Sequence, residues 1–140
     1  MLTLKLINEE TERVIKGLKK KHFENAEDAI AEVIETDRRR REAQQKLDSN
    51  LSETKKLSAR IGMLMKDGKK DEAEEIKKNV TALKEISKQL EAEKAQCEKD
   101  LTLQLCSIPN IPNDDVPEGR DASDNVVVKE GGCMPELPED

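Results

Sequence analysis

The chain is nearly devoid of aromatic residues, with one Phe and no Trp or Tyr among its 140 residues. Because compact globular cores usually rely on aromatic side chains, this absence argues against a large core. No apolar run approaches the roughly 20 residues that cross a bilayer. Lys5, Asn8, Glu9 and Glu10 interrupt the apolar N-terminus, which therefore does not read as a signal peptide. We expect a protein that acts away from membranes.

Cysteine and histidine are also scarce. Cys97, Cys106 and Cys133 are odd in number and form no CxxC pair, which argues against a disulfide framework and against a zinc site. This usage is typical of a reducing compartment, so the prediction is a cytoplasmic protein. His22 is the only histidine, and the sequence has no Gly-rich phosphate loop, HExxH or nucleophile elbow. We therefore predict no catalytic residue, metal ligand or cofactor in this chain.

Proline is absent before residue 109, and all five prolines lie in residues 109–140. Two long, highly charged stretches without proline carry apolar residues at alternating spacings of three and four, on either side of a break at 67–71. This pattern predicts an all-α fold: a long antiparallel two-helix coiled-coil hairpin, with helices at about 26–66 and 71–107. A short helix at about 9–20 would pack at its base through Val14, Ile15 and Leu18.

Local signals set the expected helix ends. Asn8, Asn25 and Asp71 are predicted N-caps, and Gly68 is predicted to close the first long helix in a left-handed conformation. Two antiparallel registers of the hairpin remain open, since the length of the tip loop is not determined.

The heptad pattern also predicts which side chains form the seam between the two long helices. In the first helix these are Ile30, Val33, Leu47, Leu51, Thr54, Ser58, Ile61 and Met65, with Leu57 and Leu64 widening the seam and polar Asp37, Arg40 and Gln44 between Val33 and Leu47. In the second helix they are Ile76, Val80, Leu83, Ser87, Leu90, Lys94, Cys97, Leu101, Gln104 and Ile108.

The net charge of −6 hides a strong asymmetry along the chain. Residues 38–70 hold eleven bases and four acids, a net charge of +7, whereas residues 109–140 hold two bases and nine acids, a net charge of −7. A basic segment of this kind suits an anionic partner. The candidate polyanion-binding residues lie around the tip: Lys55, Lys56, Arg60, Lys66, Lys69, Lys70, Lys77 and Lys78. The alternative is ordinary solubilisation of a coiled coil by lysine.

Two further features have a functional and a plain interpretation. The run Arg38–Arg41 either binds phosphate or forms a solvated helix face paired with acids such as Glu35 and Glu42. Gly62 either permits close approach of a nucleic-acid backbone or is a tolerated weak point in the helix.

Residues 109–140 read as a proline-rich, irregular linker, in which Val126, Val127 and Val128 form a short strand candidate. The chain stops without a closing element, so we expect a fragment that ends before a further domain.

Four strings in the right order resemble the N-terminal domain of seryl-tRNA synthetases: "MLTLKLINEETERVIKGLKKK", "ETDRRRREAQQKLDSNLSETKKLSARIG", "KDGKKDEAEEIKK" and "LCSIPNIPNDDVPEGRDASDNVVV". The resemblance implies a tRNA-binding arm at residues 1–108 and, at 109–140, a linker toward an absent class II catalytic domain. It further implies that the arm binds the long variable arm and elbow of serine tRNA, and of selenocysteine tRNA, by shape and phosphate contacts, with no DNA or membrane partner.

The same resemblance implies that the parent protein is an ATP-dependent serine–tRNA ligase. ATP and Mg²⁺ would belong to the absent catalytic domain, and the fragment itself would be non-catalytic. Dimerisation in this family depends mainly on that domain, so we expect a monomeric fragment and a homodimeric parent. The alternative from the residues alone is a structural or chaperone-like hairpin that binds protein clients at its tip, for which Met63 and Met65 are the only indication.

Overall fold

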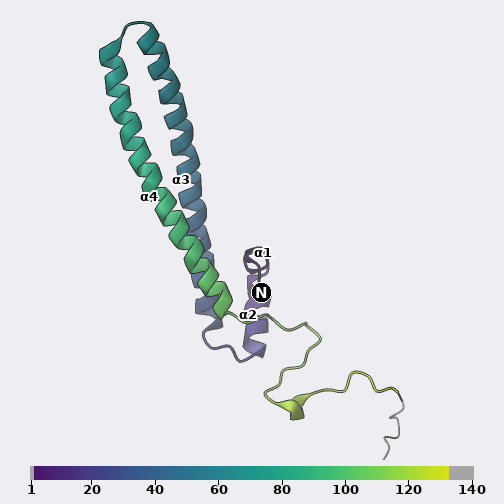
Figure 1. The fold of residues 1–140 in the computed structure, drawn as a ribbon. Helices are drawn as coiled ribbons and strands as arrows, with labels where there is room; N and C mark the ends of the chain where they lie inside the picture. The colour runs from purple at the N-terminus through teal and green to yellow at the C-terminus, as the bar shows by residue number, and fades with distance from the viewer. Residues whose placement is uncertain (1, 133–140) are drawn as a thin grey trace, which may run out of the picture.

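A computed structural model describes residues 2–132 and confirms the all-α fold within them. Its elements are α1 (Leu4–Glu9), α2 (Thr11–Lys20), α3 (Ala26–Lys66), α4 (Lys70–Ser107) and a 3₁₀ turn, η1 (Ala122–Asp124). The long helices α3 and α4 pack side by side as an antiparallel hairpin, and α1 and α2 lie at its base (Figure 1). The hairpin therefore projects its tip far from the base.

The N-terminal segment contains one more helix than the sequence predicted. Thr3 caps α1 by accepting a hydrogen bond from the Leu6 amide at 3.3 Å, and α2 begins separately at Thr11. The expected N-cap role of Asn8 is wrong, because Asn8 lies inside α1. Its side-chain amide donates to the Leu4 carbonyl at 2.8 Å and to Asp37 Oδ2 at 3.5 Å. Asn8 thus links α1 to α3.

Of the other two expected N-caps, Asn25 does occupy the N-cap position of α3, whereas the role of Asp71 is wrong. Asn25 precedes α3 in the left-handed conformation with φ 54°, and its side chain makes no capping hydrogen bond. Helix α4 begins at Lys70, one residue earlier than expected, so Asp71 lies in its first turn and complements the helix dipole there.

The expected role of Gly68 is confirmed, since it closes α3 with φ 75°. The Gly68 amide donates to the Met65 carbonyl at 3.4 Å and the Lys69 amide to the Leu64 carbonyl at 3.0 Å. This is the paired arrangement of a Schellman motif, which satisfies carbonyls at the helix end.

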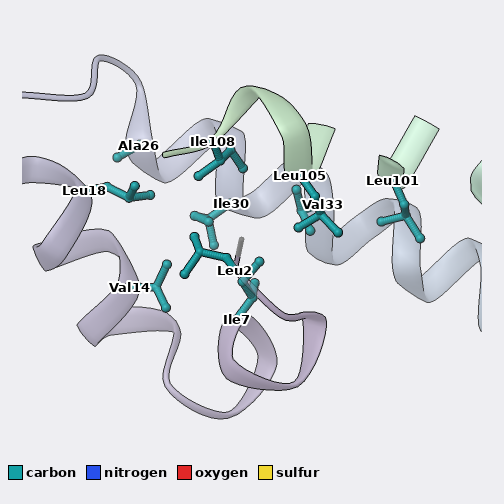
Figure 2. Close-up of a cluster of buried hydrophobic side chains, with 10 residues drawn as sticks. All are labelled: Leu2, Ile7, Val14, Leu18, Ala26, Ile30, Val33, Leu101, Leu105 and Ile108. Carbon is teal, nitrogen blue, oxygen red and sulfur yellow. The ribbon is translucent and has the colours of Figure 1, made fainter. Parts of the chain in front are cut away.

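A small apolar core holds the base together. Figure 2 shows the ten buried side chains that form it, drawn from the N-terminal segment, α2, the first turns of α3 and the last turns of α4: Leu2, Ile7, Val14, Leu18, Ala26, Ile30, Val33, Leu101, Leu105 and Ile108. Burying a large aliphatic side chain contributes about 1.5–3 kcal/mol. The base is therefore the region of the chain best able to hold a fixed tertiary structure.

The seam of α4 follows the predicted heptads, but that of α3 differs at alternate positions. Leu51 and Met65 are 47% and 48% exposed and Ser58 is exposed. The residues one position earlier take their places: Asn50, Leu57 and Leu64. The prediction was wrong at these positions because it assigned apolar Leu51 and Met65 to the seam and left polar Asn50 outside it. The packing of α3 against α4 rotates α3 so that Asn50 faces α4 instead.

Buried polar contacts fix the register that the sequence left open. The Asn50 side-chain amide donates to Ser87 Oγ at 2.9 Å and to the Leu83 carbonyl at 2.7 Å. Nearer the base, Gln104 donates to Thr36 Oγ1 at 3.2 Å. A single polar residue in a coiled-coil seam specifies register because any shift would leave its hydrogen bonds unmade.

After α4 the chain becomes irregular, as expected, although residues 109–116 remain close to α2. Val126, Val127 and Val128 form no strand and are 64%, 68% and 95% exposed, so the strand candidate is wrong for this segment. The last part of the expected linker, residues 133–140, including Cys133, lies outside the described residues. Among residues 2–132, no helix combines the length and apolarity needed to cross a membrane.

Candidate nucleic-acid interface

The distal part of α3 is a continuous basic segment. Residues 55–66 contain four bases, Lys55, Lys56, Arg60 and Lys66, and no acid. All four side chains are exposed, while Leu57, Ile61 and Leu64 turn toward α4. Within residues 2–132, none of the four cations forms an ion pair. Their charges are therefore free to meet an external anion.

The facing part of α4 is close to neutral. Residues 70–78 contain three bases and four acids. Lys77 pairs with Glu74 at 2.5 Å, and Lys69, just before the helix, pairs with Glu72 at 3.4 Å. The hydrogen bond from Lys77 and its charge lower the pKa of Glu74. The positive field at the tip thus comes mainly from α3.

The seam positions show which candidate residues share a face. The ion pair between Arg39 and Glu93, at 3.8 Å, marks one flank of the hairpin. Arg60 lies three heptads after Arg39, on the same flank, and Lys56 is its i−4 neighbour. The opposite flank carries Lys55 on α3. Lys70 and Lys77, one heptad apart on α4, lie on that flank as well. Lys66 and Lys78 lie on the outer faces of α3 and α4. The eight predicted residues therefore surround the tip and do not form a single patch.

Gly62 lies on the outer surface of α3, one heptad after Lys55 and one turn before Lys66. A Cβ atom built there would have no neighbour within 4 Å. Among residues 2–132, no packing contact requires glycine at this position.

The arginine run at residues 38–41 is engaged with acids of the chain. Arg38 pairs with Glu35 at 2.6 Å and also with Glu42, Arg39 pairs with Glu93, and Arg40 and Arg41 both pair with Asp37, at 2.8 and 2.5 Å. This arrangement favours the interpretation of the run as an acid-paired helix face over that of a phosphate site.

Asp37 is the residue whose role the sequence analysis missed. Its side chain is 2% exposed and accepts hydrogen bonds from Arg40 and, more weakly, from Asn8. Burial raises the pKa of Asp37, but the hydrogen bonds and charges of Arg40 and Arg41 outweigh it and hold the pKa below its ordinary value. An acid three and four residues before two arginines on one helix is the signal that could have identified it.

Hollows and clusters of possible metal ligands complete the description of the surface. One hollow, of about 460 Å³, lies across the seam beside Asn50, Ile86 and Leu90, and it is open to solvent. Over the described part of the chain, no group of three His, Cys, Asp or Glu side chains is placed to hold a metal ion. The arrangement can bind an extended anion along a rod.

A long coiled-coil hairpin on a small helical base, with unpaired cations near its tip, defines a helical arm with a basic end. A family model described as the seryl-tRNA synthetase N-terminal domain matches residues 1–112. The chain belongs to this family.

Relatives of known identity agree with this assignment. The chain is 40% identical to a serine–tRNA ligase of Nautilia profundicola over 96% of its length and 38% identical to one of Zymomonas mobilis over 89%. It also matches a crystal structure of seryl-tRNA synthetase from Pyrococcus horikoshii complexed with ATP, with TM-score 0.81 and 28% identity over 90% of the chain and 28% of that structure. The chain spans only 29–32% of the two relatives' length.

Proposed function

We propose that this chain is the tRNA-binding arm of a serine–tRNA ligase. The observation that carries the proposal is the set of four exposed, unpaired cations on the distal part of α3, in a chain that belongs to the seryl-tRNA synthetase N-terminal domain family. Phosphate groups attract such cations, and each contact releases counterions from the nucleic acid. A rod that carries them suits the outer surface of a folded RNA.

The proposed target is the long variable arm and elbow of serine tRNA, and of selenocysteine tRNA. Because the chain has a single aromatic residue, base stacking contributes little, and recognition rests on shape and on contacts with the phosphate and sugar backbone. The arm would hold the tRNA so that its acceptor end reaches a catalytic site outside this chain.

The division of the parent protein follows from the same proposal. Residues 1–108 form the arm, and residues 109–140 lead toward a catalytic domain that uses ATP and Mg²⁺ to attach serine to tRNA. We propose a monomer for this chain, which is itself non-catalytic, and a cytoplasmic homodimer for the parent ligase.

The RNA contacts are proposed around the tip. Lys55, Lys56, Arg60 and Lys66 come first because they lie on a stretch of α3 that contains no acid. Lys70 and Lys78 follow, because four acids share their stretch of α4. Lys69 and Lys77 contribute less, since a phosphate would have to compete with Glu72 and Glu74 for them. Gly62 permits close approach of the RNA backbone between Lys55 and Lys66.

The test is a titration of the chain against serine tRNA and against the same tRNA without its variable arm, each at two salt concentrations. We expect binding that requires the variable arm and weakens as salt rises. Equal affinity for both RNAs would reduce the tip to nonspecific electrostatics, and affinity independent of salt would overturn the proposal.

One observation favours the chaperone-like alternative: Met63 and Met65, close to the tip, are 66% and 48% exposed. Flexible methionine side chains suit variable apolar partners. This function predicts that the chain binds an unfolded protein and that replacing both methionines by Gln abolishes this binding. A chain that is monomeric by light scattering and binds no unfolded protein would eliminate it.

A further inference from the structure

The segment that follows α4 does not leave the base of the hairpin at once. Residues 109–116, here called the strap, run beside α2 (Figure 1). Ile108 is buried in the core of the base, and Ile111 packs against the same core. Pro109 and Pro112 restrict the backbone of the strap, which lowers the entropy lost when it is held in place.

Gly17, in the middle of α2, is the point of closest approach. A Cβ atom at this position would lie 2.8 Å from both Cβ and Cγ2 of Ile111. The Cβ atom of Ile111 is bonded directly to the backbone, so it cannot move away without moving the strap itself. Glycine is the poorest helix former after proline, so its presence inside α2 is explained by the room it leaves for Ile111.

Polar contacts on either side of Gly17 hold the same segment. Arg13 pairs with Asp114 at 3.1 Å. The Lys20 ammonium donates to the carbonyl oxygens of Asp114, at 3.1 Å, and Val116, at 2.8 Å. A crevice of about 150 Å³ remains between α2 and the strap, bordered by Arg13, Gly17 and Lys20. One face of α2 thus provides an apolar contact flanked by two cations that bind the strap.

We infer that the strap is a built-in anchor, which fixes on α2 the point from which the chain beyond residue 116 departs. Gly17, Arg13 and Lys20 are the positioning residues of this anchor. The direction of the hairpin relative to the following chain is then set at α2 and not by a free hinge after Ile108. The inference rests on contacts within this chain and does not depend on RNA binding.

The experiment measures backbone ¹⁵N order parameters of strap residues 110, 111, 113 and 114 in the 140-residue chain and in two variants. Gly17→Ala introduces the clash with Ile111, and Gly62→Ala makes the same change in a helix where the new Cβ meets nothing. We expect values near 0.85 in the original chain and in Gly62→Ala, and values below about 0.6 in Gly17→Ala.

Circular dichroism accompanies the measurement, because alanine should preserve α2 while the strap is released. If Gly17→Ala loses helicity, the double variant Arg13→Gln/Lys20→Gln tests the same point without touching the core, and the same fall in strap order is expected. Low order parameters in the original chain, or strap order that survives these substitutions in folded protein, would overturn the inference.

Discussion

At the scale of the residue, the buried carboxylate of Asp37 is a charged group closely surrounded by partners within the chain. Asp37 is nearly fully buried yet ionised, and two arginines on its own helix together with Asn8 of α1 surround it. A buried carboxylate is retained only when such partners replace its water. Asp37 therefore joins the polar stretch of the seam to α1.

Replacing Asp37 by Asn should lower the free energy of unfolding at neutral pH by about 2 kcal/mol, the typical contribution of hydrogen bonds to a charged group. Because the pKa of Asp37 is lowered in the folded state, its contribution is fully present above the ordinary value of 3.8 and is lost as the pH falls through the lower folded pKa. Urea unfolding from pH 7 to pH 2 measures both effects.

Asp48→Asn is the matched control for that experiment, since Asp48 is an exposed acid on the same helix. It should leave the free energy of unfolding unchanged within about 0.5 kcal/mol. If Asp37→Asn behaved like this control, Asp37 would not stabilise the base.

Substitution of Gly62 should affect the stability of the chain and its affinity for tRNA in opposite directions. Gly62→Ala should stabilise the chain by about 0.8–1.0 kcal/mol, the difference in helix propensity, because the new methyl group meets no other atom. If RNA approaches the backbone here, the same variant should bind serine tRNA more weakly despite its higher melting temperature. Thermal melting and the tRNA titration measure the two effects, and unchanged affinity would remove Gly62 from the proposed interface.

At the scale of the element, the hairpin depends on a narrow seam. Leu83 lies in this seam at the level of Asn50, which donates to its carbonyl, whereas Ile86, three residues later, is 46% exposed. Two apolar residues close together on α4 therefore occupy different environments, and a substitution at each tests the rotation of the helix.

Leu83→Asp should destabilise the distal hairpin by at least about 2 kcal/mol, because it replaces a seam side chain by an unpartnered charge. Ile86→Asp, the matched control, should change stability by only about 0.5 kcal/mol. Circular dichroism and thermal melting measure both. Unchanged helicity and melting in Leu83→Asp would contradict this placement of the seam.

At the scale of the whole molecule, charge is distributed so that the tip of the arm differs from its base. The arginines at residues 38–41 are occupied by acids, whereas the distal cations of α3 are not. Lysine neutralisations at the tip and in the middle of the rod should therefore have unequal effects on RNA binding.

Lys55→Gln should reduce the slope of log affinity for serine tRNA against log salt by about 0.7–0.9, the effect of losing one phosphate contact. Lys77→Gln should reduce it less, since Lys77 already pairs with Glu74. Lys88→Gln, in the middle of α4 with a 78% exposed side chain, is the control and should leave the slope unchanged. Equal slopes for all three variants would show that the tip is not the binding surface.

Much of this architecture was determined by the sequence itself. Heptad spacing, the absence of proline before residue 109 and Gly68 at the turn specify two long helices and their reversal, because these are local properties of the backbone. The seam of α4 was likewise predictable, since apolar residues hold its phase at Ile76, Val80 and Leu83. The location of the basic segment also follows directly from composition.

Tertiary structure alone decided the remaining features. Local propensity could not predict that Asn50, and not Leu51, occupies the seam. Asn50 is stabilised there by its hydrogen bonds to Ser87 and to the Leu83 carbonyl, which lie across the seam on α4. Nor could local propensity pair Arg39 with Glu93, because that ion pair joins α3 to α4, whereas the other pairs of residues 38–41 lie within one helix at spacings of three and four. The close approach of Ile111 to Gly17 joins residues far apart in sequence, and such contacts are defined only when the helices pack.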